Sequence, residues 1–341
     1  MNPIVDREKG LLELERRITE LKGLSSSQNV DLSSQIAALE AEYAKIQREI
    51  FGTLSPWHRV NMARHPKRPT AAEYVAKLDQ FDELHGDRHF RDDPAVIAGF
   101  AKLRSRRIMV VGQQRGRDTK ENLRVNFGMV KPEGYRKIRR LFELASRLGL
   151  PIVALVDTKG ADPGIDSEEH AQSEAIAACL YALAESTVPS VSVVIGEGGS
   201  GGALALGMTD RILMLEHSIY SVAGPEAAAA ILFADATKAP EAAASLRLTS
   251  EDLYRFGIAD EVIAEPLGGA HRDRDVTIDR VLSAVDRQLS ELGARTTEQL
   301  QEERYSKYRR IGALNTNKMP SVVTPSGPST SLGVNSVEGP R

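Results

Sequence analysis

The sequence predicts an α/β domain with a buried, parallel central sheet. Its 341 residues, 41% of them hydrophobic, supply enough apolar material for one large domain with attachments. From residue 151 to residue 215, short apolar runs alternate with helical patterns and with glycine-rich turns. Strands that alternate with helices in this way usually pair in parallel and are covered on both faces.

Two amphipathic helices come first. Apolar residues recur every three or four positions over 11–21 and again over 32–50, with a polar break between them. Asp31 can cap the second helix, and Gly52 can end it. We expect residues 1–54 to form an antiparallel helical hairpin, an arm that docks onto another surface.

The main domain is expected over 55–293. Ser55-Pro56 opens a helix, and Thr70 with Glu73 has the spacing of a capping box for another helix, which Gly86 would end. The later elements are expected as strands at 96–103, 108–111, 151–157, 190–195, 211–215 and 261–265, and as helices at 132–148, 168–185, 203–207, 225–233, from 249, and at 277–292. A C-terminal helix over 294–314 and a disordered, Ser- and Pro-rich tail over 315–341 complete the chain.

Composition narrows the function classes. A net charge of −3 argues against a general nucleic-acid binder. The apolar runs are far shorter than the roughly 18–20 residues that cross a bilayer, and the start lacks a signal-peptide pattern, so we expect a cytoplasmic protein. Cys179 is the single cysteine, so a disulfide or a cysteine-based zinc site cannot form within this chain. Basic residues crowd 102–140, which predicts a local positive field for an anionic substrate or partner.

The most informative segment is the glycine-rich stretch 193–203, which runs from a buried strand into a helix start. The first N–H groups of a helix have no partner within it and lie at the positive end of its dipole. Such groups can stabilise a developing oxyanion, and glycine lets a substrate approach closely. The turn 157–164 also follows a buried strand. Because ligands gather at the carboxyl ends of parallel strands, we expect both turns to form one site made largely of backbone.

A dinucleotide site is one alternative for the glycine stretch. Gly196, Gly198 and Gly201 have the spacing of the dinucleotide fingerprint, and Glu216 lies near the distance of a ribose-binding acid. A nicotinamide-dependent oxidoreductase would fit this pattern. Only residues 203–209 separate the stretch from the next strand, however, which is short for such a crossover.

A serine hydrolase is the other alternative. The glycines around Ser200 also fit a nucleophile elbow, and a triad would draw on Asp210, Asp235 or Asp260 and on His217 or His271. A serine at a helix start is nevertheless more often a cap than a nucleophile.

Seven stretches, in one order, carry a resemblance to a known family. They are ARHPKRP at 63–69, FDELHGDR at 81–88, GRDTKE at 116–121, NFGMVKPEGYRK at 126–137, QSEAIA at 172–177, VIGEGGSGGALALG at 194–207 and EPLGGAH at 265–271. Together they resemble the alpha subunits of bacterial and plastid acetyl-CoA carboxylase carboxyltransferase, from about residue 11 to residue 308. Seven ordered stretches are far more specific than any single glycine motif.

The resemblance implies a crotonase-like fold, a superhelix of repeated ββα units, and a reaction of fatty acid biosynthesis. The carboxyl group of carboxybiotin, borne by a carrier protein, passes to acetyl-CoA and gives malonyl-CoA. Carboxybiotin releases CO2, its ureido oxyanion takes the α-proton of acetyl-CoA, and the enolate attacks CO2. Two oxyanions therefore need stabilisation, and no side-chain triad is required.

The resemblance also implies residue roles and partners. The expected oxyanion hole on the biotin side consists of Gly201 and Gly202, with substrate-binding positions at Gly160, Ala161, Gly199 and Ser200. A beta subunit would supply the second hole and most of the CoA site in an α2β2 assembly, and the chain alone would be inactive. The biotin carboxyl carrier protein and the ATP-using biotin carboxylase would be separate chains. No biotin is expected to be attached covalently here, and zinc is expected only in the beta subunit.

The chain departs from the family pattern at two turns. The family reads Asp-Thr-Pro-Gly-Ala-Tyr-Pro-Gly where this chain has Lys159 and Asp162, and Ala223-Gly224 replace Ile-Ser before Pro225. Both turns fall near the expected site. Our hypothesis is that these residues reshape the acyl or biotin pocket, as in a paralogue that uses another acyl-CoA.

Overall fold

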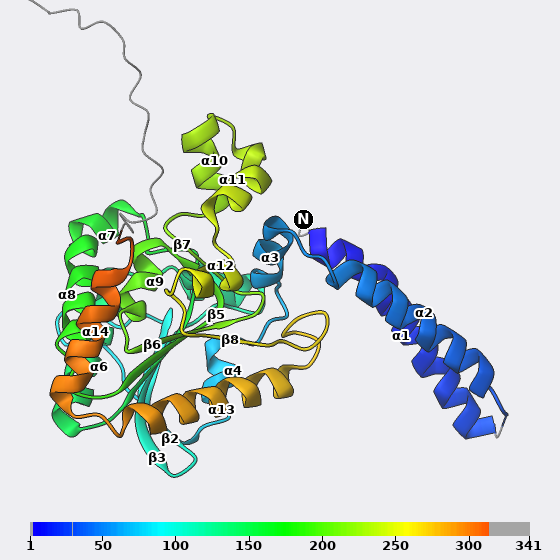
Figure 1. Ribbon diagram of the computed structural model, residues 1–341, viewed down its shortest axis with the longest axis horizontal. Helices are drawn as coiled ribbons and strands as arrows, with labels where there is room; N and C mark the ends of the chain where they lie inside the picture. Colours follow the sequence, from blue (N-terminus) through cyan, green and yellow to red (C-terminus); the bar gives the residue numbers. More distant parts are fainter. Residues whose placement is uncertain (1–2, 29, 314–341) are drawn as a thin grey trace, which may run out of the picture. The chain divides into compact units, whose positions relative to one another are not determined.

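A mixed eight-stranded sheet lies at the centre of the structure, a computed structural model that describes residues 3–28 and 30–313 (Figure 1). The strands are β1 (Asp79–Glu83), β2 (Val96–Leu103), β3 (Arg106–Gln113), β4 (Ile152–Thr158), β5 (Ser190–Gly199), β6 (Arg211–Leu215), β7 (Ile219–Ser221) and β8 (Glu261–Ile263). The order is β1-β2-β3-β4-β5-β6-β8, and β7 pairs with β5. The pairs from β3 to β8 are parallel, as predicted, while β1, β2 and β3 are antiparallel.

Helices cover both faces of the sheet because the buried strands are apolar on both sides. In β4, Ile152, Ala154 and Val156 pack toward α6 (Pro132–Leu148) and α8 (Gln172–Ala184). The alternate residues Val153 and Leu155 pack toward α4 (Ala71–Val75) and α13 (Arg274–Leu292). Figure 1 shows α6 and α8 on one side of the sheet and α13 on the other.

The remaining helices are short, apart from the first two and the last. They are α1 (Pro3–Gln28), α2 (Ser33–Phe51), α3 (Pro56–Ala63), α5 (Thr119–Arg124), α7 (Ile165–Glu169), α9 (Ser200–Gly207), α10 (Pro225–Phe233), α11 (Ala239–Leu246), α12 (Ser250–Arg255) and α14 (Thr297–Arg310), with 3₁₀ turns η1 (Asn126–Gly128) and η2 (Ala236–Lys238). The predicted caps of α3 and α4 at Ser55 and Thr70 are present, and Gly149 ends α6 in the left-handed conformation.

Two predictions about local structure are wrong. The helix expected from Thr70 to Gly86 ends at Val75, and β1 follows it. Pairing with β2 overrides the helical pattern, and Gly99 permits it, since a Cβ there would lie 2.1 Å from the carbonyl oxygen of Asp82. In addition, the glycines at 196–199 belong to β5, so the helix that follows starts at Ser200 rather than at 203.

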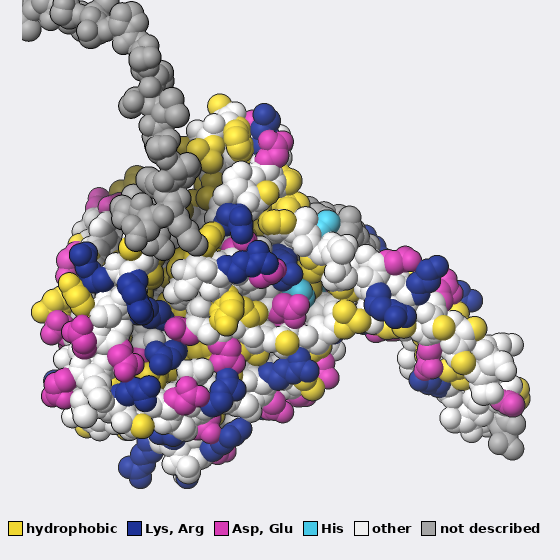
Figure 2. Space-filling view, in the orientation of Figure 1, with side chains coloured by type: hydrophobic (Ala, Val, Ile, Leu, Met, Phe, Trp, Pro, Cys, Tyr) yellow, Lys and Arg dark blue, Asp and Glu magenta, His cyan; other side chains and the backbone are white. Residues whose placement is uncertain are grey.

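Acidic partners neutralise most of the basic segment 102–140. Figure 2 shows basic and acidic side chains interspersed over the visible face. The ion pairs join Arg104 and Arg106 to Asp286, Arg115 to Asp157, Arg117 to Glu73, Lys131 to Asp166, Arg136 to Asp87, Lys137 to Asp92 and Arg139 to Glu143. The predicted positive field is therefore largely compensated locally.

The predicted tail and the predicted domain boundaries both stay untested. The tail predicted to be disordered, 315–341, lies outside the described residues. The domain boundaries proposed at 54 and 293 stay predictions. Within the part of the chain that is described, none of the helices has the length and apolar character to span a membrane.

Candidate functional site

Two backbone turns meet at the carboxyl ends of β4 and β5. These strands are parallel, with Thr158 opposite Gly198. A Cβ on Gly199 would lie 2.1 Å from the carbonyl oxygen of Lys159, and a Cβ on Gly202 would lie 2.6 Å from the nitrogen of Ala161. The predicted closeness of the two turns is confirmed, and glycine is the residue that allows it.

The first turn of α9 presents its N–H groups without a side-chain cap. Gly199 occupies the N-cap position and no side chain bonds the first turn there. Ser200 is exposed and Gly201 is half-buried, whereas Gly202 is buried. A Cβ on Gly201 would lie 3.7 Å from Ile176 of α8, an ordinary contact. The turn therefore offers backbone donors at the surface, with more room at Gly201 than at Gly202.

Hydrogen bonds from side chains fix the shape of the turn after β4. The hydroxyl of Thr158 lies 2.7 Å from Gly160 O and accepts Gly160 N–H at 3.1 Å. Asp162 accepts from Asn126 Nδ2 at 2.9 Å and from Ser167 Oγ at 2.6 Å. Burial opposes ionisation of Asp162, but these hydrogen bonds, together with the charge of Lys131 and the Gly164 N–H, outweigh it and lower its pKa. Asp162 thus shapes the turn from within.

Lys159 differs from Asp162 in its surroundings. Its side chain is exposed, directly before Gly160. Of the two departures in this turn, Lys159 is therefore the one that a ligand can meet directly.

The triad predicted for a serine hydrolase does not assemble. Ser200 has a φ of +54°, which is compatible with a strained nucleophile elbow. Within the described residues, however, its hydroxyl makes no hydrogen bond to a histidine. His271 bonds Glu8, and Nδ1 of His217 faces Arg59.

The dinucleotide alternative is disfavoured by its short crossover. One oxygen of the Glu216 carboxylate accepts the N–H of Glu265 at 3.1 Å, which anchors this side chain to the segment after β8. The helix after the glycines has eight residues, as the short spacing indicated.

Charged side chains that the sequence analysis did not assign hold the end of β5. Arg64 bonds Glu197 through Nε at 3.0 Å and through Nη2 at 2.6 Å. Arg68 is buried, donates to Ile195 O at 3.0 Å and forms a two-bond pair with Glu265. Burial opposes ionisation of Glu265, but Arg68 outweighs it and lowers the pKa of Glu265 to about 2.

Asp157 supports the glycine stretch from the neighbouring strand. Its Oδ1 accepts Glu197 N–H at 3.0 Å and Arg115 Nη1 at 3.2 Å. Burial raises the pKa of Asp157, against the effect of these donors. A Cβ on Gly196 would lie 2.5 Å from the same oxygen, which explains glycine at that position.

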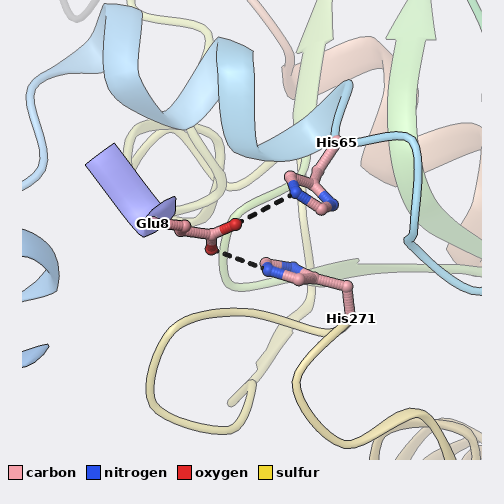
Figure 3. A group of neighbouring side chains, drawn as sticks. All are labelled: Glu8, His65 and His271. Carbon is pink, nitrogen blue, oxygen red and sulfur yellow. Dashed lines mark hydrogen bonds and ion pairs between the residues drawn. The ribbon is translucent and has the colours of Figure 1, made fainter. Parts of the chain in front are cut away.

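The arm docks through a cluster of Glu8, His65 and His271, whose side chains are 3% to 4% exposed (Figure 3). Glu8 Oε1 lies 2.8 Å from His271 Nε2, and Oε2 lies 3.2 Å from His65 Nε2. The two imidazole rings stack with centroids 3.7 Å apart. One carboxylate from α1 thereby joins two segments far away in the sequence.

The same three side chains could in principle hold a metal ion, since their ligand atoms lie within 4.8 Å of one another. The hydrogen bonds argue otherwise. His65 Nδ1 accepts the N–H of Lys67 at 3.2 Å, so a neutral His65 carries its proton on Nε2 and donates it to Glu8. A metal on Nε2 would require the proton on Nδ1, where it would face the N–H of Lys67 instead of accepting from it. Because a metal would cost this hydrogen bond, we interpret the cluster as a docking contact.

We predict that acid weakens this docking. Burial opposes ionisation of Glu8, but the hydrogen bonds from both histidines outweigh it and lower the pKa to about 2 from 4.5. Burial lowers the pKa of His271 below 6.5. The His271 contribution is complete above pH 6.5 and decreases below it, and the Glu8 contribution is lost between pH 4.5 and 2. Hydrogen exchange of the α1 and α2 amides, corrected for intrinsic rates, should therefore rise from pH 7 to pH 5.5.

Glu8→Ala should produce the same opening at neutral pH. It leaves two buried N–H donors without an acceptor, at about 1–3 kcal/mol each. Glu20→Ala is the matched control, because Glu20 lies on the same helix in an exposed pair with Arg16. Equal exchange in both variants would contradict the assigned role of Glu8.

These contacts account for two of the stretches that carried the family resemblance. Stretch 63–69 supplies Arg64, His65 and Arg68, and stretch 265–271 supplies Glu265 and His271. Together they join the end of β5 to the arm. The family pattern marked these two stretches in the sequence, but it assigned no role to any of these side chains.

Solved structures share this fold. Transcarboxylase 12S superposes with a TM-score of 0.52 at 23% identity over 65% of this chain and 42% of that chain. A Pseudomonas malonate decarboxylase hetero-tetramer superposes with a TM-score of 0.52 at 17% identity, over 64% of this chain and 87% of that chain. The beta subunit of geranyl-CoA carboxylase from P. aeruginosa superposes with a TM-score of 0.51 at 19% identity, over 79% of this chain and 56% of that chain. These likenesses support the crotonase-like α/β fold that the sequence predicted.

The particular family follows from sequence relatives. A family model described as acetyl co-enzyme A carboxylase carboxyltransferase-like matches residues 4–312. Acetyl-coenzyme A carboxylase carboxyl transferase subunit alpha of Staphylococcus saprophyticus is 50% identical over 311 residues, 91% of this chain and 99% of the relative. The Thermus thermophilus subunit is 48% identical over 307 residues, which cover 90% of this chain and 97% of the relative. The chain belongs to this family of carboxyltransferase alpha subunits, which confirms the resemblance.

Proposed function

We propose that this chain is half of a carboxyltransferase active site and stabilises negative charge on the biotin side. The reaction moves the carboxyl group of carboxybiotin, presented by a biotin carboxyl carrier protein, to acetyl-CoA and yields malonyl-CoA. The observation that carries the proposal is the uncapped first turn of α9, packed on the turn at Gly160 and Ala161. Backbone donors of this kind suit an oxyanion better than a side chain that must first lose or gain a proton.

In this proposal carboxybiotin binds transiently, as a substrate presented by the carrier protein. When bound, carboxybiotin supplies CO2 and a basic ureido oxygen. The N–H groups of Gly201 and Gly202 would face that oxygen, while Ser200, Gly199, Gly160 and Ala161 would form the wall around it. No step requires the hydroxyl of Ser200.

The proposed assembly needs a second chain. A beta subunit would hold most of CoA and the oxyanion hole for the acetyl-CoA enolate, in an α2β2 complex in the cytoplasm. A separate biotin carboxylase would load the carrier. Zinc is proposed only for the beta subunit, since Cys179 of this chain is buried and its thiol donates to Tyr135 O at 3.0 Å.

Co-expression with a beta subunit tests the proposal. The purified complex should form malonyl-CoA from acetyl-CoA and a carboxylated biotin carrier. A complex that carboxylates propionyl-CoA with a higher kcat/KM than acetyl-CoA would change the proposed substrate, and Lys159→Pro would then be the first variant to test. A folded complex without transfer to either thioester would contradict the proposal.

A further inference from the structure

One buried side chain makes a direct hydrogen bond to the first turn of α9, where the oxyanion is proposed to bind. Gln113, the last residue of β3, is fully buried, and its Nε2 donates to Gly202 O at 2.7 Å. Among the described residues, this is the one side-chain hydrogen bond to residues 199–203. Tyr135 Oη also lies close to Gly202, since a Cβ on Gly202 would be 2.8 Å from it. This hydroxyl has no hydrogen-bond partner in the described part of the chain.

The partners of Gln113 fix the orientation of its amide. Asp157 N–H can only donate, and it lies 3.2 Å from Oε1. Gly202 O can only accept, and it faces Nε2. Reversing the amide would place two acceptors together and two donors together, so a single orientation satisfies both contacts. The amide therefore ties the ends of β3 and β4 to the first turn of α9.

We propose that Gln113 is a positioning residue that holds the Gly202 carbonyl and so restrains the first turn of α9, the turn whose Gly201 and Gly202 N–H groups are proposed to face the substrate oxygen. This inference rests on the proposed function. Gly202 is held from two sides, because its Cα packs on the Gly160–Ala161 peptide while Gln113 holds its carbonyl. The restrained carbonyl belongs to the peptide between Gly202 and Ala203. That peptide shares the Gly202 Cα with the peptide that carries the Gly202 N–H, so the two contacts together limit rotation of the first turn of α9. Such preorganisation costs no rearrangement during the reaction.

Gln113→Met is the direct test. Methionine has a similar size but makes neither hydrogen bond. In the reconstituted complex, kcat should fall about 10- to 100-fold, the effect of a small misplacement of a reacting group. KM for acetyl-CoA should stay unchanged, because CoA binds mostly to the other subunit in the proposed assembly. A general loss of structure would instead lower the yield of the complex.

Gln114→Met is the matched control. Gln114 is the next residue, and its amide accepts Ala72 N–H at 2.9 Å and donates to Arg115 O at 2.8 Å. It makes the same number of bonds to backbone, but none to α9. Its removal should leave kcat unchanged.

Gln113→Glu gives a signature that a merely structural role would not produce. A protonated carboxyl keeps both contacts, since its O–H can donate to Gly202 O and its second oxygen can accept from Asp157 N–H. Burial and the nearby Asp157 carboxylate disfavour the ionised form. The kcat of this variant should therefore be close to normal at low pH and fall as the introduced group ionises. This variant also replaces Gln113→Met as the test if the methionine variant does not fold.

The outcomes separate this inference from the function on which it rests. An inactive wild-type complex counts against the proposed function. An active wild-type complex with normal kcat in Gln113→Met, or equal losses in Gln113→Met and Gln114→Met, overturns the role of Gln113 alone. A kcat of Gln113→Glu that is as low at acid pH as at alkaline pH also overturns it.

Discussion

Gly201→Pro should lower kcat of the assembled enzyme by about 10²–10³-fold, the usual effect of losing one oxyanion donor. Proline removes the N–H of residue 201, and position 201 lies in the first turn of α9, where proline is tolerated. Space is available, because a Cβ there would make only an ordinary contact with Ile176 at 3.7 Å. Gly202 is a poorer target, since any side chain would collide with Ala161 N and mix steric damage with donor loss.

Two controls accompany this variant. Gly201→Ala keeps the N–H and adds the same Cβ, so it should keep most of the activity. Ser200→Ala should do the same, whereas a serine hydrolase would lose about 10⁶-fold in kcat. Because Ser200 has a φ of +54° and a residue before proline is conformationally restricted, circular dichroism must show that Gly201→Pro folds. Equal losses in Gly201→Ala and Gly201→Pro would contradict a role for the N–H.

Arg68→Met should destabilise the fold by about 3–5 kcal/mol, the usual cost of breaking a buried ion pair on one side. The change removes both bonds to Glu265 and both donors to Ile195 O. Urea unfolding should show a lower midpoint with an unchanged slope. A second change, Glu265→Gln, should recover part of the loss, because it removes the uncompensated charge.

Arg104→Met is the surface control for this prediction. Arg104 pairs with Asp286 at 2.9 Å, but its side chain is 61% exposed. The loss should stay below about 1 kcal/mol. Similar midpoints for the two variants would show that the Arg68 pair does not hold β5.

The glycine site could be predicted from the sequence because its signals are local. A buried strand, a run of glycines and a helix start are adjacent in the chain, and they predict backbone donors near Gly199 to Gly202, although the helix starts three residues earlier than expected. The turn at Gly160 could be predicted to lie beside these glycines, because parallel strands present their carboxyl ends at the same edge of a sheet.

The support of that site could not be predicted, because its partners are far apart in the chain. Gln113 is 89 residues from Gly202, Arg64 is 133 from Glu197, and His271 is 263 from Glu8. No periodicity or spacing rule connects such pairs. The strand β1 was missed for a related reason, since pairing with β2 decides its conformation against the local helical pattern.

The central claim is that this chain forms half of one active site, and a titration tests it most directly. Increasing amounts of beta subunit are added to a fixed amount of this chain, and the initial rate of malonyl-CoA formation from acetyl-CoA and carboxylated carrier is measured. We predict no transfer by this chain alone, a rate that rises with added beta subunit, and saturation at equimolar chains. Transfer by the isolated chain, or labelling of Ser200 by a fluorophosphonate together with complete inactivity of Ser200→Ala, would contradict the account.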